Sequence, residues 1–153
     1  MDLSKFAREE LILSGVAILL ALDLLFLPWF QVSIGLGSLE LSASSTGTGA
    51  PDGWLGVLGV LACLALLADL ALERLSTANL PTIGGSRAAT RFALAVVAAA
   101  CVALKFLLNV HFDLFGFGFW AAVALSVALV VFARRLASEP GPRPARDGDV
   151  NAP

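Results

Sequence analysis

Four long apolar stretches, separated by polar segments, limit what this chain can fold into. Each is about 20 residues long, the length of a helix that crosses a hydrocarbon layer about 30 Å thick. Charged residues make up 14% of the 153-residue chain and hydrophobic residues 58%, whereas soluble domains carry about 25% charged residues. The sequence therefore predicts an all-α membrane protein, with a bundle of four transmembrane helices inside residues 1–137. The predicted helices cover residues 11–30, 54–75, 88–110 and 117–135.

The basic residues lie on one side of these helices. Nine of the ten Lys and Arg residues fall in the N-terminal segment, around the link between the second and third helices, or in the tail. Because cytoplasmic segments carry the excess of Lys and Arg, we predict a multi-pass plasma membrane protein with both the N- and the C-terminus in the cytoplasm. The tail, residues 138–153, is rich in Pro, Gly and charge without a period, and we expect it to be disordered.

The outer link between the first two helices, residues 31–53, is patterned. Apolar residues alternate with small or polar ones on both sides of Gly37-Ser38, a dipeptide that suits a two-residue type II′ turn. In that register three apolar pairs share one face: Leu36 with Leu39, Ile34 with Leu41 and Val32 with Ala43. An isolated hairpin is marginal in water. We therefore predict a short extracytoplasmic β-hairpin that lies over a surface such as the outer ends of the helices. The alternative is an ordinary loop.

Two ionisable residues interrupt the apolar stretches near their outer ends. Asp23 lies seven residues before Phe30 and Lys105 five residues before Val110, so both sit about 8–10 Å below the outer surface. Each charge alone is costly in hydrocarbon. We therefore predict an Asp23–Lys105 ion pair, with Asn109 one turn above Lys105 on the same face. The alternative is that Lys105 extends to the outer interface without a partner.

A further carboxylate, Asp69, is a secondary candidate. It lies near the cytoplasmic end of the second helix, a turn before Glu73, within reach of water, Arg74 or Arg91. An interfacial carboxylate is the favoured interpretation, and a proton-relay site is the alternative.

No set of catalytic, cofactor-binding or metal-binding residues stands out, so we expect no enzyme activity and no cofactor. Cys63 and Cys101 are isolated in apolar stretches; they suit small apolar filling more than a disulfide. His111 is the only histidine, and the net charge of −2 gives no basic field for nucleic acid. The weakest functional interpretation, an intramembrane enzyme, would have to use scattered residues: Asp69, Glu73, His111 and Asp113.

Three segments at the outer ends of the helices, "DLLFLPWF", "PDGWLGVLG" and "LKFLLNVHFDLFGFGFW", carry a resemblance. They resemble those of an uncharacterised family of small four-helix integral membrane proteins of actinobacteria. The resemblance covers roughly residues 10–135; it implies the topology and supplies no catalytic residue. Four helices with a hairpin after the first also resemble claudins in architecture only, because the claudin cysteine pair is missing from this outer loop.

Two functional hypotheses follow from these features. The first is a non-enzymatic scaffold or accessory subunit in the lipid bilayer, which binds a membrane or extracytoplasmic protein partner or a second copy of itself. The alternative is a small transporter, or a protein that binds a lipid or small molecule, with an outward-facing polar pocket around Asp23 and Lys105.

Overall fold

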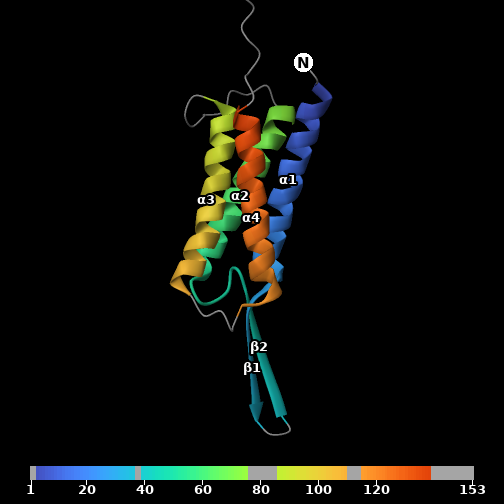
Figure 1. The fold of residues 1–153 in the computed structure, drawn as a ribbon. Coiled ribbons are helices and arrows are strands. Elements are labelled where there is room, and N and C mark those ends of the chain that lie inside the picture. Colours follow the sequence, from blue (N-terminus) through green and yellow to red (C-terminus); the bar gives the residue numbers. More distant parts are fainter. Residues whose placement is uncertain (1–2, 37–38, 76–85, 110–114, 139–153) are drawn as a thin grey trace, which may run out of the picture.

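The computed structural model describes residues 3–36, 39–75, 86–109 and 115–138. Within them the chain forms four helices and two strands (Figure 1). The helices are α1 (Leu3–Phe26), α2 (Gly53–Leu75), α3 (Arg87–Leu108) and α4 (Phe117–Ser138), and the strands are β1 (Pro28–Leu36) and β2 (Leu39–Thr46). The predicted Gly37-Ser38 turn and most of the predicted tail lie outside the described residues.

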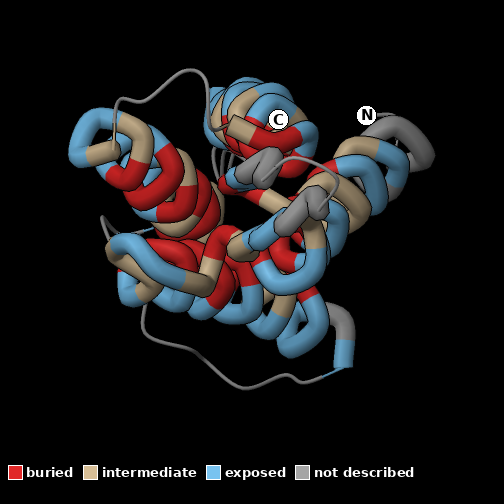
Figure 2. The backbone as a smooth tube through the Cα atoms, turned by 90° about the horizontal axis from the view of Figure 1, so that it is seen from below, coloured by how far each residue is buried: buried red, intermediate tan, exposed pale blue. Residues whose placement is uncertain are grey.

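The four helices pack side by side and form what we call the helical body. Each helix contacts its neighbours in sequence, and α1 also contacts α4, so the four close into a ring (Figure 1). Seen along the helices, the buried residues face the middle and the exposed residues face outward (Figure 2). Many outward residues are large and apolar, among them Leu61, Leu64, Val97 and Val127. An apolar outer surface of this extent is typical of a protein surrounded by hydrocarbon.

Three helices, α2, α3 and α4, are long and apolar enough to cross a membrane, which is consistent with the predicted membrane protein. Helix α1 is just as long, at 24 residues, but it is more polar. It carries Glu9 and Glu10 near its start and Asp23 near its end.

The predicted hairpin and its register are confirmed. Strands β1 and β2 are antiparallel, and all three apolar pairs stand opposite each other as expected. The expectation that the hairpin lies over the outer ends of the helices is wrong for most of its length. It projects away from the helical body, roughly along the direction of the helices (Figure 1).

The end of α1 explains this direction. The first helix was expected to continue to Phe30, but it ends at Phe26 and β1 begins at Pro28. A proline disfavours the helical conformation of the residue before it, here Leu27, and proline is tolerated at the first residue of an edge strand. Trp29 and Phe30 therefore belong to the strand, and the chain leaves the helical body already extended.

Candidate functional site at the root of the hairpin

The root of the hairpin, where it leaves the helical body, contains the two predicted intramembrane charges. Asp23 in α1 is 2% exposed and Lys105 in α3 is 1% exposed. Among the described residues no ion pair joins them. Their actual partners are Trp29 and the carbonyls of Gly47 and Gly49. We call these five residues the root cluster.

Asp23 is held by the strand that follows its own helix. The Trp29 indole Nε1 donates to Asp23 Oδ2 at 3.1 Å. The turn at Leu27 and Pro28 makes this contact, because it brings Trp29 back against the last turns of α1. The other carboxylate oxygen, Asp23 Oδ1, is buried and has no hydrogen-bond partner in the described part of the chain.

Lys105 is held by main-chain carbonyls. Its Nζ donates to Gly47 O and to Gly49 O, the second bond being 3.0 Å long, and it lies 5.5 Å from the centre of the Trp29 ring. The prediction that Lys105 pairs with Asp23 is therefore wrong. The ammonium group instead reaches outward, as in the alternative, but it ends on loop carbonyls inside the protein.

A close approach of the loop after β2 to α2 places these carbonyls. A Cβ atom added at Gly56 in α2 would stand 2.1 Å from Gly47 O, so only glycine lets the loop come so near. The Thr48 N–H donates to Leu24 O at 3.0 Å, which ties the same loop to α1. The loop is thus pinned between two helices, with its carbonyls turned to the third. The glycines at 47, 49 and 56 were the only signal of this arrangement in the sequence.

Asn109 takes part beside the root cluster. It caps the C-terminus of α3, and its Nδ2 donates to Asp52 Oδ2 and to Lys105 O, both at 3.0 Å. Asp52, which immediately precedes α2, is close enough to act electrostatically on Lys105. The structure therefore brings Lys105 and Asn109 together as predicted, and it adds Asp52, which was not a predicted site residue.

Aromatic packing fixes the position of the hairpin root. Trp29 is fully buried and meets the Phe119 ring edge-on, with centroids 5.7 Å apart. Phe30 pairs with Phe115 both as a β-bridge and through its ring, at 5.6 Å. A Cβ added at Gly116 would lie 2.3 Å from Pro28 O. Contacts with α1, α3 and α4 therefore clamp the hairpin at its base.

A second polar group, the inner cluster, lies at the opposite end of the helical body. Arg91 of α3 is 4% exposed and binds Asp69 of α2 (2.8 Å), Glu10 of α1 (3.2 Å) and Glu73 of α2. Arg91 was one of the predicted alternatives for the partner of Asp69. No pattern in the sequence indicated that Arg91 would be buried or shared by three carboxylates.

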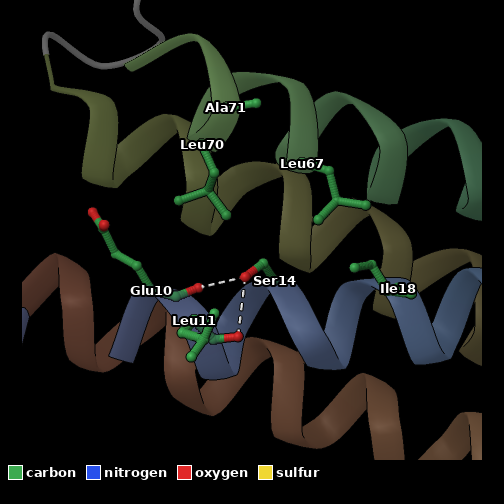
Figure 3. Close-up of a pocket in the computed structure, with 7 residues that line it drawn as sticks. All are labelled: Glu10, Leu11, Ser14, Ile18, Leu67, Leu70 and Ala71. Atoms are coloured by element: carbon green, nitrogen blue, oxygen red, sulfur yellow. Dashed lines mark hydrogen bonds between the residues drawn. The ribbon is translucent and has the colours of Figure 1, made fainter. Parts of the chain in front are cut away.

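A groove between α1 and α2 opens beside the inner cluster. Its volume is about 400 Å³, and most of its lining is apolar, including Ile18, Leu67 and Leu70. Ser14 turns its hydroxyl back to the carbonyls of Glu10 and Leu11 rather than into the groove (Figure 3). The Glu10 side chain is engaged with Arg91. The polar groups of the groove are therefore already bound within the protein.

Most polar groups of the root and inner clusters are paired within the protein, and Asp23 Oδ1 is the one atom of the two clusters that is buried without a hydrogen-bond partner among the described residues. Within the described ranges, no group of three or more His, Cys, Asp or Glu side chains is placed to hold a metal ion. Cys63 and Cys101 are both buried as free thiols, in keeping with their expected role as filling. No protein-family model, no curated protein and no solved structure matches the chain.

Proposed function

We propose that this protein is a non-enzymatic scaffold or accessory subunit of the plasma membrane, which presents its hairpin to a partner outside the cytoplasm. The observation that carries the proposal is the clamped root. Three helices hold Trp29 and its neighbours, and the rest of the hairpin projects clear of the helical body (Figure 1). A rigidly mounted projection with exposed residues is suited to binding another molecule and has no use in packing its own fold.

In this proposal α1 is a fourth transmembrane helix, in a four-helix bundle. Two of its carboxylates are paired inside the protein, because Asp23 binds Trp29 and Glu10 binds Arg91, while the exposed Arg8 lies near the start of the helix. Its outward residues are apolar, among them Ile18, Leu19, Leu22 and Leu25, all at least 40% exposed. Polar residues that face the bundle interior are compatible with a membrane span.

The proposed orientation places both termini in the cytoplasm. Arg87, Arg91, Arg134 and Arg135 lie at the end of the helical body far from the hairpin. Since cytoplasmic segments carry the positive charge, the hairpin would be outside. Single cysteines test this with a membrane-impermeant maleimide on intact cells. Ser44→Cys should be labelled and Ser138→Cys protected, and the reverse pattern would overturn the orientation.

Shortening the hairpin in register tests the proposed role. Deletion of the paired residues Ser33, Ile34, Leu41 and Ser42 removes two residues from each strand and keeps the alternation of faces. We expect the intact protein to co-purify in mild detergent with a stoichiometric protein partner. The shortened protein should lose that partner at unchanged thermal stability. A partner retained in full by the shortened protein would contradict the proposal.

The second candidate is a small transporter or a lipid- or small-molecule-binding protein. One observation favours it: Asp23 Oδ1 is buried without a partner in the described residues, and a buried carboxylate oxygen commonly has one. Mass spectrometry of the purified protein separates the two candidates. A solute or lipid retained by the native protein and lost in Asp23→Asn would favour this alternative over the scaffold.

A further inference from the structure

A long groove runs between α3 and α4 on the outward side of the helical body. Its volume is about 450 Å³. It follows α4 from Trp120 to Val131, which is about 16 Å along a helix axis. Both helices are long and apolar enough to cross a membrane, so the groove would open toward hydrocarbon. Its lining is nearly all apolar and includes Val102, Ala103 and Phe106 of α3 and Trp120, Val127 and Val131 of α4.

The middle of the groove offers no polar group to a ligand. Ser126 is the one residue with a hydroxyl in its lining, and this hydroxyl donates to the Val123 carbonyl oxygen at 2.9 Å. An occupant must therefore be apolar over most of its length. A lipid chain meets this condition, because the groove is about as long as half of a hydrocarbon core about 30 Å thick, the depth that one leaflet fills.

The groove leads to a basic residue at the end of the helical body far from the hairpin (Figure 1). Arg134 follows Val130 and Val131, which line the groove, at spacings of four and three residues, so it lies on the same side of α4. It is exposed. It stands about 25 Å from Phe117 along α4, near the surface of a hydrocarbon core about 30 Å thick. An apolar groove and a cation therefore follow each other along one side of α4.

Arg134 differs from the other arginines of these two helices. Arg87 and Arg91 of α3 form ion pairs with carboxylates of neighbouring helices. Arg135 lies over the Phe132 ring, 5.7 Å from its centre. Among the described residues no ion pair engages Arg134. Its charge is therefore the one at the end of this groove that is left for an anion from outside the protein.

We propose that the groove and Arg134 bind an anionic phospholipid of the leaflet at this end of the helical body. The acyl chain lies in the groove and the phosphate accepts hydrogen bonds from the Arg134 guanidinium, a charge-assisted contact. A chain alone would exchange freely with the surrounding lipid, because both environments are apolar. The cation adds a preference for anionic headgroups, as basic sites beside membrane helices do. This site is separate from the hairpin and goes beyond the role proposed for it.

The cation is tested by thermal unfolding of the full-length, lipid-depleted protein in mild detergent. A lipid that binds the folded protein raises its melting temperature in a saturable way. Phosphatidylglycerol should act at lower concentration than phosphatidylcholine with the same chains. Arg134→Gln should melt like the wild type without lipid, and should lose about fivefold in affinity for phosphatidylglycerol, so that the two lipids become nearly equivalent. Arg8→Gln is the matched control, because Arg8 is also exposed and lies near the same end; its affinity should not change.

The groove is tested by filling it. Val127→Trp, or Ala103→Phe as a second variant, should abolish the rise in melting temperature with either lipid. Val97→Trp is the matched control, because Val97 is 49% exposed in α3 and lies outside the groove lining. An equal loss in this control, or equal affinity of the wild type for the two lipids, would overturn the inference.

One more variant separates this site from the root cluster. Asp23→Asn should bind phosphatidylglycerol as the wild type does, since Asp23 lies near the opposite end of the helical body. Loss of the lipid in this variant would place it at the root cluster and overturn the inference. The role proposed for the hairpin is judged by a protein partner, so it can stand or fail independently of these results.

Discussion

The two ends of the helical body each bury one cation, and they satisfy it by opposite means. At the inner end Arg91 meets three carboxylates from two other helices. At the outer end Lys105 meets two main-chain carbonyls and the face of Trp29. The inner cluster is therefore built from full charges that depend on one another. In the root cluster Lys105 donates to neutral main-chain carbonyls, and these carbonyls carry no net charge that would be left unpaired if Lys105 were replaced.

This difference decides what each end contributes. Removing Arg91 would leave the largely buried Glu10 and Asp69 without the cation that they share with the more exposed Glu73, and a buried charge left without its partner is costly. The inner cluster should therefore join α1, α2 and α3 strongly. The root cluster joins a loop and a strand to the helices through single hydrogen bonds and close packing. It should respond to changes in shape at least as strongly as to changes in charge.

The largest expected effect is at the inner end. Arg91→Leu leaves the carboxylates of Glu10, Asp69 and Glu73 together without their shared cation, and we expect a loss of about 3 kcal/mol in the free energy of unfolding. Thermal unfolding in detergent measures it. Arg134→Leu, at an exposed position near the same end, is the control and should change the stability little. Similar losses in both variants would show that the buried cation is not the fastening.

The next effect is at the outer end, and it is steric. Gly56→Ala would put a Cβ 2.1 Å from Gly47 O and force the loop away from α2, at a cost of about 2 kcal/mol. Gly15→Ala is the matched control, because a Cβ there meets nothing within 4 Å and alanine favours a helix by roughly 1 kcal/mol. The two variants should therefore shift the melting temperature in opposite directions. A shift of the same sign would contradict the close approach.

A smaller loss is expected from Trp29→Phe. The ring remains to pack against Phe119, but Asp23 Oδ2 loses its donor, and a buried acceptor left unpaired costs about 1–2 kcal/mol. In a protein that already carries Asp23→Leu, the Trp29→Phe change should cause little further loss of stability, because no carboxylate is left unpaired. A full loss that persists in the double variant would show that the indole acts only by its bulk.

The smallest effect is the coupling between Asp23 and Lys105, measured by a double-mutant cycle with leucine at both positions. Since no ion pair joins them among the described residues, we expect less than about 0.5 kcal/mol of coupling. The equivalent cycle for Asp69 and Arg91 should give about 1–3 kcal/mol. If the Asp23→Leu, Lys105→Leu variant were much more stable than the two single variants predict, the result would support the ion pair that the sequence suggested.

Patterns that involve side chains at fixed spacing were predictable from the sequence. The strict alternation around Gly37-Ser38 gave the hairpin register, because a shift by one residue would have mixed its two faces. The long apolar stretches gave the helices to within a few residues, apart from the extension of α1 toward the N-terminus. Arg91 was within reach of Asp69 because both lie near the inner ends of their helices.

The sequence did not predict the main-chain partners of Lys105 or the direction in which the hairpin leaves the helices. Every residue has a carbonyl, so nothing marked those of Gly47 and Gly49 as the partners of Lys105. The aromatic pair Trp29 and Phe30 resembled the interfacial end of a membrane helix. Only the conformational effect of Pro28 turned it into the start of a strand. The alternation predicts the register of the hairpin but not the direction in which it leaves the helices.

The hydrogen bond from Thr48 N to Leu24 O brings the two ends of the intervening segment, which contains the hairpin, together. The length of this segment can therefore change without a change in the helices. Doubling a loop costs only about 0.6 kcal/mol in closure entropy. Adding one residue to each strand would exchange the two faces, whereas adding two to each would preserve them and raise the tip by about 7 Å. The length of the hairpin can therefore change in steps of two residues per strand, by evolution or by design, while the contacts at its root are kept.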